Sequence, residues 1–158
     1  MGRNQSLLFI VFPKNFTEIK IGCFTDDDSL KGISFPRSIT TLGTAMNNCY
    51  SLKRVALPDS ITATPYNMFS DSCSITKVII PRNITTIAAF SFSRAMSLRV
   101  VDFTHVLAVP TLSNSNAFLN LNHIYKIVVP DSLYEDWIAA SNWVTYADHI
   151  IKESEYNA

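Results

Sequence analysis

The sequence predicts an α/β-type solenoid, with a parallel β-sheet along one face and a helical cap at its C-terminal end. Three observations lead to this fold class. A seven-residue pattern, apolar-x-x-apolar-x-apolar-Pro, occurs in six copies, of which Leu52–Pro58 is the clearest and Leu98–Thr104 lacks the proline. The copies follow one another at nearly constant steps. After the last copy, residues 131–151 lose the pattern and carry the signals of helices.

The copies begin at residues 7, 30, 52, 75, 98 and 124, so the steps between them are 23, 22, 23, 23 and 26 residues. A fixed step of this size is typical of a solenoid, in which each repeat is one coil stacked on the last. A single coil cannot bury its own apolar side chains, so the coils have to stack. We therefore expect one solenoid domain over residues 1–158, including a cap over 131–151.

Each copy is expected to form a short β-strand. In the third copy, Val55 and Leu57 alternate with Arg54 and Ala56. Alternation with period two places one pair inside and the other pair outside. The proline then ends the strand, because it has no N–H to donate to a neighbouring strand. Two more apolar sets follow in each coil, and we expect them to line the same interior.

The segment after the last copy is expected to close the stack. Ser132-Leu133-Tyr134-Glu135 fits a capping box with Ser132 as the N-cap, which predicts a helix over about 132–141 and a short helical turn near 144–149. Terminal repeats need a lid to stay soluble. The apolar residues expected to form this lid are Trp137, Trp143, Tyr146 and Ile150.

The N-terminal end shows no comparable lid. Leu8, Phe9 and Val11 belong to the first copy, and only six residues, five of them polar or small, precede its start. An uncapped edge strand invites pairing with another chain. This predicts either a homo-oligomer formed through this edge or the truncation of a longer solenoid.

Composition excludes several classes of function. The 13 basic and 13 acidic residues give a formal charge of zero, so no bulk charge attracts the chain to nucleic acid or to a membrane. The apolar run near the N-terminus is too short for a signal peptide, and no stretch is long enough to span a membrane. The chain is therefore expected to be cytoplasmic as written, or a fragment of an exported or virion protein.

No constellation of residues indicates catalysis, a metal or a cofactor. Cys23, Cys49 and Cys73 have no CxxC or Cys/His spacing, and we expect Cys49 and Cys73 to be buried thiols in successive coils. The acidic run at 26–28 lacks the glycine and the spaced carboxylates of a calcium loop, which favours a solvated turn. No nucleophile, base and acid occur in a recognisable arrangement, so the chain is not expected to be an enzyme.

The outward residues of the stacked strands are expected to form lanes about 4.8 Å apart. Nine of the 13 basic residues fall in these lanes, whereas six acidic residues follow residue 130. This distribution predicts a docking face for a protein or glycan with an acidic patch. The alternative is a set of ordinary solvated strand edges, on which lysine blocks sheet aggregation. The residues predicted to bind the partner are Lys31, Lys53, Arg54, Lys77, Arg82, Arg99, Tyr125 and Lys126. Nucleic acid is not expected, because exposed aromatics do not interleave with the basic lane.

The repeat resembles the BspA-like leucine-rich repeats of the Treponema pallidum type. The second copy carries the resemblance best, with Leu30, Ile33, Pro36 and Cys49 at the positions of that unit. The segment from residue 117 to residue 150 is similar to the closing segment of such proteins. The resemblance implies a leucine-rich-repeat solenoid that binds rather than catalyses, as in bacterial, protist or phage proteins that adhere to host proteins or surfaces. The alternative is a short intracellular, phage-encoded inhibitor that binds and blocks a host enzyme or defence complex.

Overall fold

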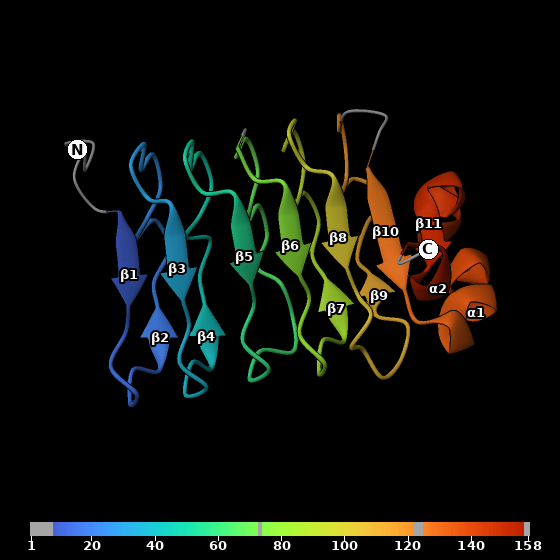
Figure 1. The fold of residues 1–158 in the computed structure, drawn as a ribbon, viewed down its shortest axis with the longest axis horizontal. Coiled ribbons are helices and arrows are strands. Elements are labelled where there is room, and N and C mark those ends of the chain that lie inside the picture. The colour runs from blue at the N-terminus through green and yellow to red at the C-terminus, as the bar shows by residue number, and fades with distance from the viewer. Residues whose placement is uncertain (1–7, 73, 122–124, 157–158) are drawn as a thin grey trace.

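The computed structural model describes residues 8–72, 74–121 and 125–156, which form a stack of similar coils closed by helices at the C-terminal end (Figure 1). A short strand lies in each of the six copies of the sequence pattern, as predicted. These strands are β1 (Phe9–Val11), β3 (Gly32–Ser34), β5 (Arg54–Ala56), β6 (Lys77–Ile79), β8 (Val100–Asp102) and β10 (Lys126–Val129).

The strands pair in parallel along one face of the stack. One sheet has five strands in the order β11-β10-β8-β6-β5, where β11 (Ile150–Lys152) comes from the cap. The pair β1 and β3 forms a separate two-stranded sheet. The interruption falls between the copies that start at residues 30 and 52, which are separated by the shortest step in the chain.

A second row of shorter strands runs beside the first in each coil where it forms (Figure 1). These strands pair in parallel as β2 with β4 and β7 with β9, and an isolated bridge joins Ala63 to Thr86. Their apolar residues Ile19, Leu42 and Ile87 are buried, as expected for the second apolar set of each coil. The row consists of β2 (Glu18–Ile19), β4 (Thr41–Leu42), β7 (Thr86–Ile87) and β9 (Thr111–Leu112).

The interior between the two rows is continuous from coil to coil. Val55 and Val78 are register partners in adjacent strands, Val78 and Val101 are partners in the next pair, and all three are buried. On the other side of the interior, the rings of Phe69 and Phe92 lie 5.6 Å apart between centroids. Each coil therefore packs the same kind of side chain on the next one, and the apolar core is shared by the whole stack.

The C-terminal segment forms the predicted lid, but its helices differ from the prediction. The predicted capping box does not form, because no side chain caps the first residues of these helices. The N–H of Leu133 donates to the Pro130 carbonyl (3.0 Å), so the chain is already helical at Ser132, whereas an N-cap residue requires a non-helical backbone. The elements are η1 (Asp131–Leu133), α1 (Tyr134–Ala139), η2 (Trp143–His149), β11 and α2 (Glu153–Tyr156).

Aromatic side chains of the lid fill the open end of the last coil. Trp137 and Trp143 are fully buried, and both rings contact Phe103 edge to face at 5.0 and 5.6 Å between centroids. The indole N–H of Trp143 donates to the Pro110 carbonyl (2.7 Å), so its polar atom is satisfied inside the core. Strand β11 was not predicted, and it extends the sheet by one strand beyond β10.

One of the predicted buried thiols lies in the described residues. Cys49 is fully buried, and its thiol donates to the Phe24 carbonyl (3.1 Å). Burial, and to a smaller extent the negative charge of Asp27, raises the pKa of this thiol to about 12. This environment makes Cys49 a packing residue and not a nucleophile. Cys73 lies outside the described residues, and Cys23 is exposed.

The substitution Val78→Asp tests the inward register. It places a carboxylate in the shared interior, so we expect the free energy of unfolding to fall by at least about 3 kcal/mol, measured by urea denaturation. Ala56→Asp is the matched control, since Ala56 is exposed on the adjacent strand and should change stability little. If the Val78 variant unfolds at the same urea concentration as the parent, the assigned register is wrong.

Candidate functional site

The strand register aligns three cationic side chains across the outer face of the five-stranded sheet. Arg54 pairs with Lys77, Lys77 pairs with Val100, and Val100 pairs with Lys126. The inward neighbours of these residues are buried, so the three cations share the outer face. We call Arg54, Lys77 and Lys126 the cationic row. Arg54 and Lys126 are exposed, whereas Lys77 is half-buried.

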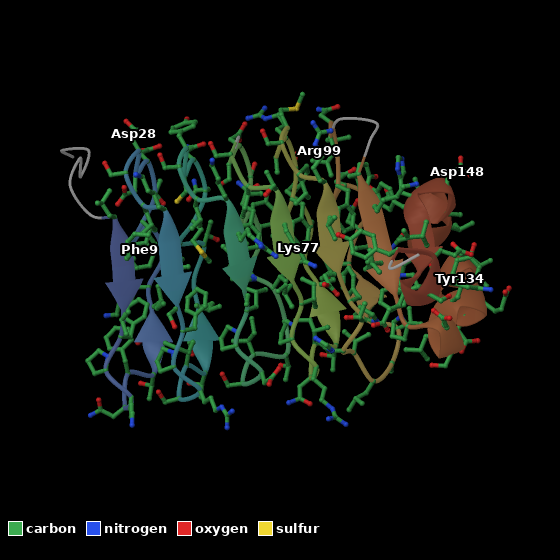
Figure 2. The ribbon with its side chains drawn as sticks, viewed as in Figure 1. Phe9, Asp28, Lys77, Arg99, Tyr134 and Asp148 are labelled. Carbon is green, nitrogen blue, oxygen red and sulfur yellow. The ribbon has the colours of Figure 1, made fainter. Side chains whose placement is uncertain are left out.

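A second set of cations lies where the strands begin, and we call Lys31, Lys53 and Arg99 the cationic rim. All three are exposed. The chain before each strand is held to its neighbour by backbone hydrogen bonds, such as the one from Thr76 N–H to the Lys53 carbonyl (2.7 Å). Arg99 marks this rim at the upper ends of the strands in Figure 2. The cationic row and the cationic rim therefore lie next to each other on one surface.

Two rim lysines line one shallow pocket of about 330 Å³, together with Tyr50, Ser51 and Ser74. Both serine hydroxyls donate to carbonyls of the preceding coil: Ser51 to Asp28 (2.5 Å) and Ser74 to Tyr50. These two hydroxyl protons are therefore already engaged in hydrogen bonds between coils. The two lysine ammonium groups are the charged donors that remain for a ligand, so the pocket suits an anionic group.

Lys77 differs from the other cations because it has a carboxylate partner on the same face. Its ammonium lies 2.7 Å from the carboxylate of Asp102 on β8. Burial alone raises the pKa of Asp102, but hydrogen bonds from Lys77 and Thr104 outweigh it and lower that pKa below its usual range. Asp102 is not among the residues predicted from the sequence. The alternation Val100-Val101-Asp102 was the signal, since it places Asp102 outward beside an outward lysine lane.

Two of the predicted binding residues lie elsewhere. The outward position predicted for Tyr125 is wrong, because Tyr125 is only 4% exposed. Its ring stacks on His149 (4.0 Å between centroids) and faces Phe118 (6.2 Å), so the cap covers the position that is open in earlier coils. Burial raises the pKa of the Tyr125 hydroxyl. Arg82 is exposed, but it follows the end of β6, away from the cationic rim. There its backbone N–H donates to the Asp59 carboxylate (3.2 Å).

The acidic run at 26–28 has a structural role at its centre. Asp27 is buried and not solvated as predicted, and its carboxylate accepts the N–H groups of Ser29 and Leu30 at 2.9 Å each. Asp26 accepts from the Asn48 side chain of the next coil (2.9 Å). Within the described residues, no three His, Cys, Asp or Glu side chains are arranged to hold a metal ion.

The ion pair between Lys77 and Asp102 gives a pH-dependent prediction. The pKa of Asp102 is lower in the folded state, so the pair stabilises the fold above the ordinary pKa of aspartate and is lost as the pH falls below it. Asp102→Asn should lower the free energy of unfolding by about 1 kcal/mol at about pH 7 and by less at about pH 3. Urea denaturation at the two pH values measures the difference. An equal loss at both would rule out the ion pair as its cause.

Comparison with known protein families bears on what this surface does. The family model described as BspA type leucine rich repeat region matches residues 3–121, with six copies. Domains of this type are protein-interaction or adhesion-type modules in general, and the family is typically non-enzymatic. A search of curated proteins found no match. Over the described residues, no helix has the length and apolar character needed to cross a membrane. The match covers most of the coils described above, and the chain belongs to the BspA-type leucine-rich repeat family.

Proposed function

We propose that this chain is a non-enzymatic interaction module that binds an acidic protein. The partner contacts the outer face of the sheet and the cationic rim where the strands begin. The observation that carries the proposal is the register of the strands, which puts Arg54, Lys77 and Lys126 in one row. Cations held at fixed positions on a rigid sheet can match carboxylates of a partner without reordering of the backbone.

The charge environment of these side chains supports the proposal. Ion pairs found within the described residues join Lys77 to Asp102 and Arg94 to Asp71, and none involves the rim cations, Arg54 or Lys126. The rim pocket adds a concave place for one carboxylate or another anionic group between Lys31 and Lys53. Arg82 lies at the opposite ends of the strands, so it contributes only if the partner covers the full width of the sheet.

Two biological settings fit such a surface. In the first, the chain acts in adhesion, as part of a surface or phage virion protein that binds a host protein or glycan. In the second, it is a short intracellular inhibitor encoded by a phage, which binds and blocks a host enzyme or defence complex. The identity of the partner distinguishes the two, because an extracellular partner supports adhesion and a cytoplasmic enzyme supports inhibition.

A pull-down with charge-reversed variants tests the proposed surface. The triple variant Lys31→Glu, Lys53→Glu, Arg54→Glu should lose a partner that the parent retains, since like charges facing one another oppose association. Its matched control is Lys14→Glu, Lys20→Glu, Arg37→Glu, which makes the same change in formal charge on exposed residues of the first two coils. Quantitative mass spectrometry of the bound proteins measures the outcome.

A partner that the control also loses would depend on net charge alone and would contradict a specific surface. A partner retained equally by both variants would place the site on another part of the molecule. In either case, thermal melting of the variants must match the parent, because all of the substituted side chains are exposed.

We propose the first coil as a second contact surface, for a second copy of the chain. Among the described residues β1 pairs only with β3, and apolar side chains lie exposed beside its free edge. Phe9 is 68% exposed and Val11 81% exposed, and Ile21 is exposed in the same coil. A free strand edge flanked by apolar side chains favours edge-to-edge pairing.

A lysine at this edge should prevent such pairing. Val11→Lys is expected to convert a dimer into a monomer in light scattering at micromolar concentration, because an edge lysine opposes strand addition. Val144→Lys is the control, since Val144 is exposed on the cap at the other end of the stack. A parent chain that is monomeric at every concentration tested would overturn this part of the proposal.

A further inference from the structure

The outer face of the sheet is covered at its C-terminal end by the chain itself. Val128 points outward, because its neighbours Ile127 and Val129 lie in the interior, yet Val128 is 0% exposed. Val100 and Asp102, on the same face of β8, are also buried. Helix α2 packs on β10 and β11 and lies close to these strands in Figure 1. The last described segment of the chain therefore takes up part of the proposed binding face.

The contacts of α2 reach the cationic row. The ring of Tyr156 lies beneath the ammonium of Lys77, 5.6 Å from ring centroid to nitrogen, although Lys77 belongs to β6, two strands away from β10. The start of α2 is fixed by the Asp131 carboxylate, which accepts the Ser154 N–H (3.0 Å). Hydrogen bonds from the Ser154 side chain and then from this N–H lower the pKa of Asp131. The helix is thus laid across the sheet toward Lys77.

This attachment is weak by construction. Helix α2 has four residues, and none of them is buried. A cation–π contact at an exposed site contributes only about 0.5–1 kcal/mol. A four-residue segment without a buried residue, held by such a contact, by exposed hydrogen bonds to Asp131 and by its packing on β10 and β11, belongs to the low-stability end of a structure, where local opening is easy. The segment can leave the face while the coils stay intact.

The chemistry of α2 is that of the partner proposed above. It carries two carboxylates, Glu153 and Glu155, and one aromatic ring, and it lies against a lysine. The uncovered part of the face, toward the first coil, also carries a cation and an aromatic ring. Arg54 is exposed there, and the ring of Phe9 lies over Gly32, where a Cβ would come within 2.7 Å of the ring. Figure 2 shows Phe9 and Lys77 on strands of this face.

Building on the proposed function, we propose that the outer face binds an acidic peptide segment that carries an aromatic residue. We further propose that α2 occupies the part of this face from β11 to Lys77 as an internal competitor. The aromatic ring of the partner takes the place of the Tyr156 ring beside Lys77, and its carboxylates face Arg54 and Lys126. Partner binding and the docked position of α2 then exclude each other.

Binding of a labelled random copolymer of glutamate and tyrosine to the full chain tests the proposal. Tyr156→Ala should bind the copolymer about two- to fivefold more tightly than the parent in fluorescence anisotropy, which corresponds to the loss of one exposed cation–π contact. Tyr66→Ala is the matched control, since Tyr66 is exposed and its ring contacts Phe90, remote from the sheet face. Polyglutamate, which lacks rings, should bind more weakly than the copolymer.

Hydrogen exchange of the parent chain reads the displacement directly. Saturation with the copolymer should speed exchange at residues 153–156, because the Ser154 N–H loses its acceptor when α2 leaves. Unchanged exchange there, or equal affinity of the parent and Tyr156→Ala, would overturn the competition. If binding in that case is still lost in the variant Lys31→Glu, Lys53→Glu, Arg54→Glu, the proposed function stands without it. Equal binding of polyglutamate overturns the aromatic requirement, and no binding of either polymer overturns the partner chemistry itself.

Discussion

No coil of this protein has a core of its own, and this constraint determines the rest of the structure. The side chains that a coil directs inward are buried only because the next coil directs the same kind of side chain against them, as Val55, Val78 and Val101 do. The last coil has no following coil, so another segment must bury its inward side chains. Trp137 and Trp143 meet that need at the C-terminal end, where their rings cover the last coil.

The same constraint fixes the surface. Because the inward residues set the register, their outward neighbours are aligned as well, and a row of cations arises from residues separated by whole coils in the sequence. Rigidity of this kind suits recognition, since the charges need no reordering on binding. The position of Lys77 at the centre of the row gives it two competing neighbours, the Asp102 carboxylate and the Tyr156 ring.

Repetition made most of the fold and much of the site predictable from the sequence. The six strands and the alignment of Arg54 with Lys77 follow from period-two alternation within copies of known spacing. One failure lies near the N-terminal end, where Asp27 is buried in a turn that was predicted to be solvated. The others lie where the last coil meets the cap. Tyr125 occupies a position that is exposed in earlier coils, but there the covering ring of His149 comes from a segment without the repeat. For the same reason the sequence pattern did not reveal β11 or the path of α2 across the sheet, since nothing periodic links them to their neighbours.

Side-chain hydroxyls bind the coils together at a separation of one coil. Ser38 donates to the Phe16 carbonyl, Thr76 to that of Lys53 and Thr85 to that of Thr62, across 22, 23 and 23 residues. Such a protein changes its length most easily by duplicating or deleting a coil-length segment, because every hydroxyl then still meets a carbonyl. A single inserted residue shifts each later hydroxyl of its coil away from its acceptor. The natural unit of evolutionary change in this chain is therefore the whole coil.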